Sequence, residues 1–459
     1  MTPRIAIAGA GISGLATAYA LEQRGFDVEI FEARDEIGGP IRTMRRDGYT
    51  VETGPHTLLV RHRVVADILD DLDLGDQVVE ADETAATRYI VRNGRPRPLP
   101  TSPLEFATTP VLSPMGRLRL LAEPLIPGRT DEIDEPLANF VRRRLGAEAL
   151  DYLVDPFVGG VWAGDPDVLS ARHAFPSLVE LEESAGSIAI GAIKRRLTGG
   201  HKEETVPRRL VAFRDGMQTL VDRFADRLTA PIHRTSPVRK LRRDKEDWRV
   251  IYQRGKARRG KSFDAVVSTV PTRSFAELEW ENTRPPTDAV DELEAMPYAP
   301  CCVLTLGFER HRVGHPLDGF GCLVPRVEDF NILGSLFVSS MFPGRAPDGC
   351  VNLTVFVGGA RQPALTERSD GEILERAHLD LRRLLDIEGD PVFDHLTRWQ
   401  RAIPQYEVGH GALLDRLDEL ESGLPNVFFA GNYRDGIAVP DLLEASVEHA
   451  RRIETAFAN

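Results

Sequence analysis

The sequence is short of cysteine and of positive charge, and both shortages exclude classes of protein. Only four of its 459 residues are cysteines, and no two of them form a C-x-x-C pair: Cys301, Cys302, Cys322 and Cys350. We therefore expect reduced core thiols rather than a disulfide framework or a zinc site. The formal net charge of −13 argues against a nucleic-acid partner, because binding phosphates requires a basic face.

The sequence also lacks an apolar run long enough to span a bilayer. The first expected strand begins at Arg4, which leaves no room for a signal peptide. We therefore expect a cytoplasmic protein. A peripheral position on the cytoplasmic face of the membrane is an open alternative. No Ser-His-Asp or Cys-His set has supporting context, and no zinc spacing occurs. The chemistry of an enzyme built on this chain would then belong to a cofactor.

The first forty residues hold the most informative motif. An apolar run suited to a buried strand, Arg4–Ala8, leads directly into the sequence GAGISG of Gly9–Gly14. Helical spacing then extends over Leu15–Arg24, and a second apolar strand, Val28–Phe31, ends in Glu32. Strand, glycine turn, helix, strand and acid in this order indicate a dinucleotide-binding βαβ unit rather than an isolated tight turn.

The glycines of this unit allow a tight turn and a close approach of the backbone to a pyrophosphate, which the helix N-terminus attracts. We predict that two groups of residues contact the dinucleotide. The pyrophosphate would contact Gly9, Gly11, Ile12, Ser13 and Gly14, and the ribose would contact Glu32 and Ala33. The motif alone does not choose between NAD and FAD.

A second glycine pair favours FAD. Gly38 and Gly39 are followed by Arg42, which places a cation beside another close backbone approach. Here the sequence resembles the FAD-dependent amine oxidase superfamily, whose members extend the dinucleotide motif with a double glycine. Many members carry arginine directly after the glycines, whereas this chain has Pro40, so Arg42 is the nearest substitute. No cysteine lies in the last hundred residues, so we expect the FAD to be non-covalent.

Several later segments allow two interpretations each. His56 is a solvated turn residue or lies beside a flavin, and Arg88, at the start of a hairpin that turns at Asn93-Gly94, is an edge charge or a carboxylate clamp. Gly159 and Gly160 mark a turn between helices or a close approach to a flat ligand. Val111–Pro127 belongs to a packed helix pair or to an amphipathic patch in a membrane interface.

The order of these features predicts an α/β fold in which a discontinuous, Rossmann-like FAD-binding domain carries an α+β substrate domain with an antiparallel sheet and a mostly helical insertion. We expect the FAD-binding domain in residues 1–86, 201–272 and 393–459. The substrate domain would comprise a hairpin at 87–101 and residues 273–392, and the helical, membrane-associating insertion would be residues 102–200.

Several stretches taken together resemble the oxygen-dependent protoporphyrinogen oxidase family: GYTVETGPHTLL, RYIVRNG, DPFVGGVWAGDPDVLS, AFPSLVELE, IPQYEVGH and AGNYRDGIAVPDLLEA. The resemblance runs in order from Arg4 to about Ala456. It implies a six-electron oxidation of protoporphyrinogen IX in haem biosynthesis, with a flavin as hydride acceptor and molecular oxygen reduced to hydrogen peroxide. It also implies peripheral membrane contact and a homodimer.

The resemblance further implies roles by position. Arg88 would pair with a substrate propionate, Gly160 would approach the macrocycle, and three apolar residues would contact its pyrrole rings: Leu323, Leu336 and Phe356, each of which equally suits a plain sheet core. Trp162 replaces a smaller residue of plant relatives in this region. The remaining expected FAD contacts are Gly54, Pro55, His56, Val238, Trp399, Gly431, Asn432 and Val439.

Three alternatives remain at this point. Coproporphyrinogen III, with four propionates, would require more cations at the pocket mouth. An amine oxidase or desaturase is less favoured, because Gln405–His410 departs from the amine oxidase pattern. A non-catalytic scaffold of the GDP-dissociation-inhibitor type is disfavoured by the intact glycine motif and Glu32.

Overall fold

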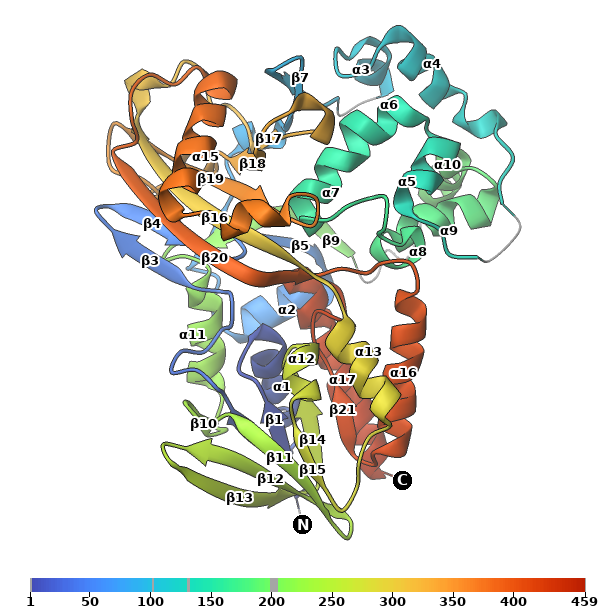
Figure 1. The fold of residues 1–459 in the computed structure, drawn as a ribbon, viewed down its shortest axis with the longest axis vertical. Coiled ribbons are helices and arrows are strands. Elements are labelled where there is room, and N and C mark those ends of the chain that lie inside the picture. The colour runs from blue at the N-terminus through green and yellow to red at the C-terminus, as the bar shows by residue number, and fades with distance from the viewer. Residues whose placement is uncertain (1, 101–102, 130–132, 199–204, 459) are drawn as a thin grey trace.

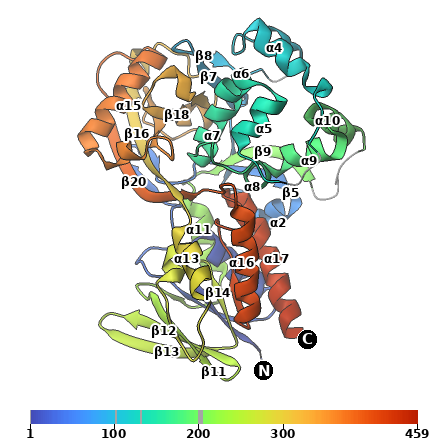
Figure 2. The ribbon, with the colours of Figure 1, turned by 45° about the vertical axis from the view of Figure 1, so that its right-hand side comes forward.

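The computed structural model describes residues 2–100, 103–129, 133–198 and 205–458. Both termini lie at the same end of an elongated molecule, below a wider upper half (Figure 1). The upper half contains a β-rich part and, beside it, a helical part, and the two are separated clearly in the rotated view of Figure 2.

The end near the termini is built on a parallel sheet with strand order β10-β2-β1-β14-β21. Its strands are β1 (Arg4–Ala8), β2 (Asp27–Phe31), β10 (Ile232–His233), β14 (Ala265–Ser268) and β21 (Val427–Phe429). They come from three distant stretches of the chain, and every neighbouring pair is parallel. Parallel strands buried on both faces require apolar residues at successive positions, which accounts for the continuous apolar runs.

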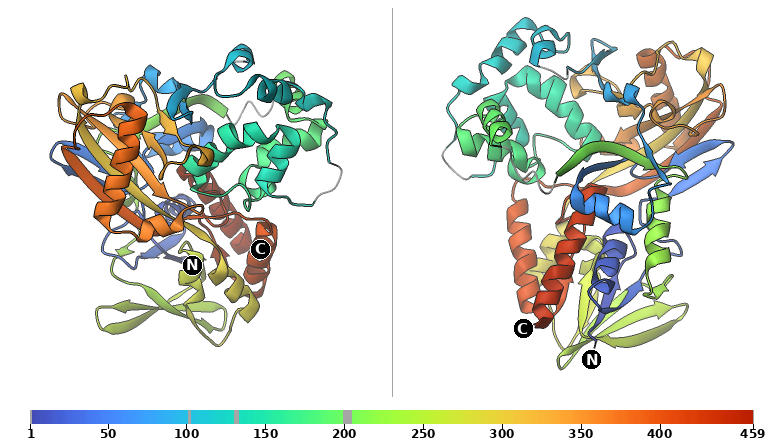
Figure 3. Two further views of the ribbon diagram at one scale, coloured as in Figure 1. Left: turned by 45° about the horizontal axis from the view of Figure 1, so that its top comes forward. Right: turned by 180° about the vertical axis from the view of Figure 1, so that it is seen from behind.

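Helices cover one face of this sheet. They are α1 (Ile12–Glu22), α11 (Gln218–Arg227) and α17 (Val439–Ala458), and their apolar sides join one core with the strands. Figure 3 shows α1 lying between α17 and α11 when the molecule is seen from behind. On the other face lies a second sheet of order β13-β12-β11-β15, with strands β11 (Val238–Asp244), β12 (Asp247–Arg254), β13 (Ala257–Phe263) and β15 (Glu279–Glu281).

The β-rich upper part is a seven-stranded sheet of order β20-β16-β19-β18-β17-β7-β8. Its strands are β7 (Tyr89–Arg92), β8 (Arg95–Pro98), β16 (Tyr298–Glu309), β17 (Gly321–Leu323), β18 (Ile332–Leu336), β19 (Cys350–Gly358) and β20 (Phe393–Pro404). All neighbours are antiparallel except β7 and β17. Helix α15 (Asp370–Leu385) covers one face through Ile373, Ala377 and Leu381.

The helical part holds α3 (Pro103–Thr108), α4 (Pro114–Leu121), α5 (Leu137–Arg144), α6 (Ala147–Ala149), α7 (Asp155–Trp162), α8 (Ala171–Ala174), α9 (Pro176–Ala185) and α10 (Ile188–Leu197). A fully buried ion pair between Arg144 and Glu123 lies at its centre. Glu123 also accepts hydrogen bonds from the backbone N–H groups of Ile188 and Ala189, so one carboxylate both neutralises the arginine and caps α10.

Shorter elements connect these parts. The strands are β3 (Thr43–Arg46), β4 (Tyr49–Glu52), β5 (Leu58–His62), β6 (Val78–Glu80) and β9 (Thr205–Phe213), and the helices are α2 (Arg63–Asp71), α12 (Thr272–Ala276), α13 (Thr287–Ala295), α14 (Val338–Met341) and α16 (His410–Gly423). Strands β3 and β4 form a hairpin, and β5, β9 and β6 form a three-stranded sheet. Among the described residues, no helix is both long and apolar enough to cross a membrane.

The structure corrects several local expectations. Gly159 and Gly160 lie inside helix α7 rather than in a turn. Helix α10 continues to Leu197 and β9 begins at Thr205. Residues 199–204, which include the expected boundary at 201, lie outside the described chain. The cysteines are free as expected, although Cys350 is only half-buried.

Candidate active site

The glycine motif forms the predicted turn between β1 and α1. Gly9 has a φ of +104°, and a Cβ on Gly14 would lie 2.1 Å from the carbonyl oxygen of Gly9, so neither position accommodates a side chain. A Cβ on Gly11 would meet nothing within 4 Å, and this residue caps α1 without any side-chain hydrogen bond. No side chain therefore caps the first N–H groups of α1, which fits the pyrophosphate of a dinucleotide. Ile12 and Ser13 begin this helix.

Glu32 lies beside the same turn. Its carboxylate accepts hydrogen bonds from the backbone N–H of Ala10 at 2.7 Å and of Arg34 at 2.9 Å, and Ala33 is exposed next to it. The N–H of Ser236 donates to the Glu32 carbonyl oxygen at 2.7 Å. That bond places Val238, two residues further along, near the end of β2, where an adenosine would continue from the pyrophosphate.

The second glycine pair contacts the first. The N–H of Gly38 donates to the carbonyl oxygen of Ala10 at 2.7 Å, and a Cβ on Gly39 would lie 3.7 Å from the Cα of Gly11. Both residues have positive φ, +95° and +63°, which favours glycine. Arg42 donates to the Gly39 carbonyl oxygen at 3.2 Å and forms an ion pair with Glu36, so its guanidinium already has a carboxylate partner.

The segment of Gly54, Pro55 and His56 joins the two halves of the molecule. Trp399 of β20 donates from Nε1 to the Thr53 carbonyl oxygen at 2.6 Å, which fixes the start of this segment against the seven-stranded sheet. His56 is buried, so the solvated-turn interpretation is wrong. Its Nε2 lies 3.1 Å from the hydroxyl oxygen of Thr354 on β19. Burial lowers the pKa of His56 to about 4, and the imidazole is therefore neutral at pH 7.

The C-terminal part of the predicted FAD contacts lies in the loop between β21 and α17. Gly431 has a φ of +138°, and Val439 begins α17, whose first turn contains Asp441. The hydroxyl of Tyr406 donates to the carbonyl oxygen of Asn432 at 2.7 Å and accepts from the N–H of Gly436 at 3.0 Å. Nothing in the sequence indicates that Tyr406 meets this loop.

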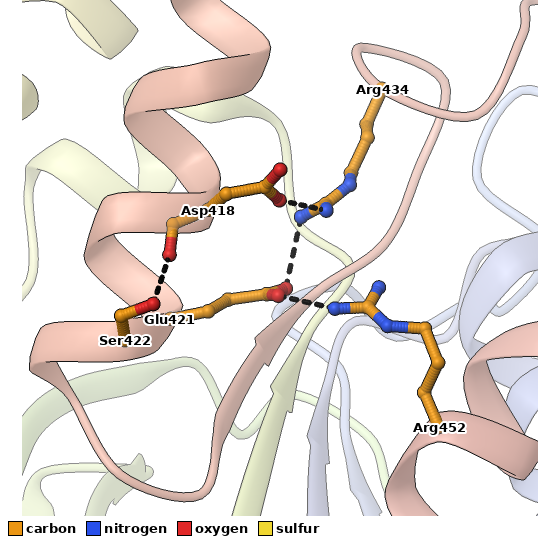
Figure 4. Close-up of a pocket in the computed structure, with 5 residues that line it drawn as sticks. All are labelled: Asp418, Glu421, Ser422, Arg434 and Arg452. Atoms are coloured by element: carbon orange, nitrogen blue, oxygen red, sulfur yellow. Dashed lines mark hydrogen bonds and ion pairs between the residues drawn. The ribbon is translucent and has the colours of Figure 1, made fainter.

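A charged hollow supports the same loop (Figure 4). Arg434 bonds Glu421 at 2.9 Å and also pairs with Asp418, and Arg452 of α17 pairs with the other oxygen of Glu421. Glu421 further accepts from the N–H of Phe429 at 2.8 Å. Because every charge in the hollow is compensated by a neighbour, we interpret it as a brace for the loop rather than as a ligand site.

The three predicted pyrrole contacts share one face of the seven-stranded sheet. Leu323 and Phe356 are both paired with Gly334, which lies between them on β18, and Leu336 is paired with Gly321. Leu323 and Leu336 are the half-buried residues of β17 and β18, whose other residues are buried, and Phe356 is half-buried between buried neighbours on β19. These strands therefore expose apolar side chains on the face opposite α15.

Helix α7 lies against this face. A Cβ on Gly160 would be 2.4 Å from Cδ2 of Leu323, and a Cβ on Gly159 would be 2.5 Å from Nη2 of Arg361. The glycines thus serve close packing of the helix on the sheet, which explains why they occur in a helix that they would otherwise weaken. Trp162 at the end of α7 is buried and packs against Tyr406, with ring centroids 5.0 Å apart.

Arg88 precedes β7 at the border between the sheet and the helical part. Its side chain is exposed, and its guanidinium lies 5.4 Å from the ring centroid of Phe320. Within the described residues Arg88 forms no ion pair. The structure thus brings together most predicted residues in two adjoining groups, one around the glycine motif and one on the sheet face, with His56 bonded across them.

Comparisons with known proteins agree with this geometry. Residues 12–453 match the model of the family described as flavin containing amine oxidoreductase. The chain is 36% identical to protoporphyrinogen oxidase 2 of Arabidopsis thaliana, covering 95% of this chain and 91% of that protein. It is 28% identical to coproporphyrinogen III oxidase of Bacillus subtilis, covering 96% and 95%. A crystal structure from Exiguobacterium superposes with a TM-score of 0.81 at 25% identity, covering 99% of both chains.

Proposed function

The chain belongs to the flavin containing amine oxidoreductase family and is an FAD-dependent oxidase, and from this premise we propose that it oxidises protoporphyrinogen IX to protoporphyrin IX. The substrate loses six hydrogen atoms, and three molecules of oxygen take them up as three molecules of hydrogen peroxide. The observation that carries the proposal is the sheet face on which Leu323, Leu336 and Phe356 stay half-buried while their strand neighbours are buried. An apolar face of this kind suits a flat macrocycle.

FAD, when bound, supplies the two-electron acceptor for a hydride that leaves a methylene bridge of the substrate. The first turn of α1 and the Gly38-Gly39 pair would hold its pyrophosphate, and the loop braced by Tyr406 and Glu421 would hold its other end. Helix α7 and the sheet face would orient the macrocycle and exclude water from it. His56 lies between these groups and stays neutral, so the chain places no histidine charge at their junction.

Arg88 would bind a propionate of the substrate. Arginine presents two parallel N–H donors that match a carboxylate, and the Arg88 guanidinium has no acidic neighbour in the described chain to satisfy it. Because the protein as a whole carries a charge of −13, attraction of an anionic substrate depends on local cations of this kind.

The test is porphyrin fluorescence in air, with the yellow holoprotein given protoporphyrinogen IX or coproporphyrinogen III in parallel. We expect faster turnover of protoporphyrinogen IX, with hydrogen peroxide formed at three equivalents per porphyrin. Preference for coproporphyrinogen III, the substrate named for the Bacillus subtilis relative, would replace the proposed substrate. Absence of both reactions from a protein that carries FAD would overturn the assignment to porphyrinogens.

We also propose that the helical part contacts a membrane surface peripherally. Four side chains along α4 and just after it are 61–84% exposed: Met115, Leu118, Leu121 and Leu125. Ile193 and Leu197 of α10 are similarly exposed, and the last turn of that helix carries Lys194, Arg195 and Arg196. Apolar side chains next to basic ones are typical of helices that lie in a membrane interface.

Co-sedimentation with vesicles of phosphatidylethanolamine and phosphatidylglycerol tests the membrane contact. We expect the wild type in the pellet, and a Leu118→Ser/Leu121→Ser variant in the supernatant. A variant with the same change at an exposed leucine of α15, Leu379→Ser, controls for general effects on solubility. Wild type that stays in the supernatant would refute the contact. The cytoplasmic location and the homodimer stay predictions, and light scattering would measure the latter.

A further inference from the structure

One row of paired residues runs across the sheet from the predicted pyrrole contacts to an arginine, Arg97. Strand pairing connects Phe356 to Gly334, Gly334 to Leu323, Leu323 to Ile90, and Ile90 to Arg97. Residues paired across neighbouring strands point to the same side of a sheet. Arg97 therefore projects on the same face as the predicted pyrrole contacts, at the far end of their row.

Arg88 lies on this face as well. Tyr89 is paired with both Cys322 and Pro98, and the N–H of Leu99 donates to the Arg88 carbonyl oxygen at 2.7 Å, so Arg88 stands opposite Leu99. Alternation along the strands puts Arg88 on the side of Ile90 and makes it a diagonal neighbour of Arg97. Such neighbours are about 7–8 Å apart, within reach of long side chains. Figure 1 places β7 beside β17, where the sheet borders the helical part.

The cations of this hairpin differ in their partners. Arg92 bonds Glu148 at 2.9 Å and lies 3.7 Å from the ring centroid of Tyr152, so its charge is compensated. In the part of the chain that the structure describes, the side chain of Arg97 donates no hydrogen bond and forms no ion pair, and the residue is only half-exposed. The guanidinium of Arg97 therefore has no acidic partner that would compete with a ligand carboxylate, and it lies on the same face as Arg88 and next to it.

We infer that Arg88 and Arg97 together bind two carboxylates carried on one edge of a flat apolar ligand, a conclusion that rests on the proposed function and specifies its substrate. Protoporphyrinogen IX carries its two propionates on neighbouring pyrroles along one edge. Coproporphyrinogen III carries one propionate on each pyrrole, so half of them would face the row of Ile90, Leu323 and Phe356, which holds no charge. Burying a carboxylate there without a partner is costly, and the two-propionate substrate is therefore selected.

The experiment compares Arg97→Gln with Arg95→Gln, because Arg95 is an exposed arginine on the same strand, two residues closer to the hairpin turn. For Arg97→Gln we expect the KM for protoporphyrinogen IX to rise about tenfold, because one charge-assisted hydrogen bond to the substrate is lost. The kcat should stay within about twofold of wild type. Arg97→Lys should recover much of this loss. Arg95→Gln should match wild type.

Binding of the product porphyrin gives a readout that does not depend on turnover. In a fluorescence titration, Arg97→Gln should bind protoporphyrin IX about tenfold more weakly than Arg95→Gln does. Both variants should bind the dimethyl ester of protoporphyrin IX equally, because the ester lacks the propionate charges. Equal binding of the free acid by the two variants, or no binding of it by wild type, would overturn the inference. Failure of the proposed function appears separately, as wild type that binds porphyrin but oxidises neither porphyrinogen.

Discussion

Nη1 of Arg361 lies 2.7 Å from both carboxylate oxygens of Asp155, the first residue of α7. Both side chains are nearly buried, at 6% and 4% exposed, and the N–H of Arg326 donates to the same carboxylate at 2.9 Å. Arg361 follows β19, so this pair attaches the helix that carries Gly160 to the sheet that carries Phe356. The separation between helix and sheet, and with it the width available to a ligand, depends on this ion pair.

Arg361→Met should destabilise the protein by about 3–5 kcal/mol, because it leaves the Asp155 carboxylate buried without its main partner. Urea denaturation of the holoprotein measures this change. Arg254→Met, at an exposed arginine of β12, is the matched control and should change the free energy of unfolding by less than about 0.5 kcal/mol. Equal midpoints for the two variants would contradict the role of the pair.

Gly160→Ala separates packing against Leu323 from helix propensity. Alanine favours a helix by about 1 kcal/mol over glycine, but its Cβ would displace the terminal methyl group of Leu323. We expect unfolding free energy within about 1–2 kcal/mol of wild type and a KM raised several-fold, because the displaced methyl group enters the ligand face. Gly371→Ala on α15, where a Cβ meets nothing within 4 Å, should leave KM unchanged.

Glu52 should make stability fall as the pH rises from about 4.5 to 7. Burial raises the pKa of its carboxyl to about 7 in the folded protein, against about 4.3 in an unfolded chain. The folded state therefore binds the proton more tightly, and the stability that this contributes is present at low pH and lost through pH 7. Relative to Glu52→Gln, wild type should lose roughly 3 kcal/mol over this range.

Urea midpoints between pH 4.5 and 8.5 test the Glu52 prediction. The exposed Glu83→Gln variant serves as control and should follow the wild-type profile. A Glu52→Gln profile parallel to wild type would show that the carboxyl titrates at its ordinary pKa.

Tyr406→Phe should weaken the binding of FAD about tenfold while the fold stays intact. The substitution removes the hydroxyl that bonds Asn432 and Gly436 but keeps the ring, which stacks on His410 with centroids 3.9 Å apart. Each lost hydrogen bond is worth about 1 kcal/mol. Recovery of flavin fluorescence on dilution measures the affinity, and Tyr19→Phe, whose hydroxyl forms no hydrogen bond in the described chain, should behave as wild type.

The sequence by itself determined the dinucleotide-binding unit and the family. Residues 4–32 combine strand, glycine turn, helix and acid within one short stretch, and such local constraints survive in any tertiary context. The apolar contacts Leu323, Leu336 and Phe356 came from the resemblance alone, since periodicity treats them like any sheet residue. The structure places them together on the sheet face opposite α15.

Only the tertiary structure decided which side chains meet. The local sequence of residues 54–56 is typical of a turn, yet His56 is buried against the seven-stranded sheet. The local sequence around Gly159 and Gly160 also suits a turn, and only their close contacts with Arg361 and Leu323 explain why glycines occur inside helix α7. The sequence of β8 has no pattern that singles out Arg97, and the position of this residue depends on the register of five strands. Register and burial arise from contacts between residues hundreds of positions apart, which a local pattern does not encode.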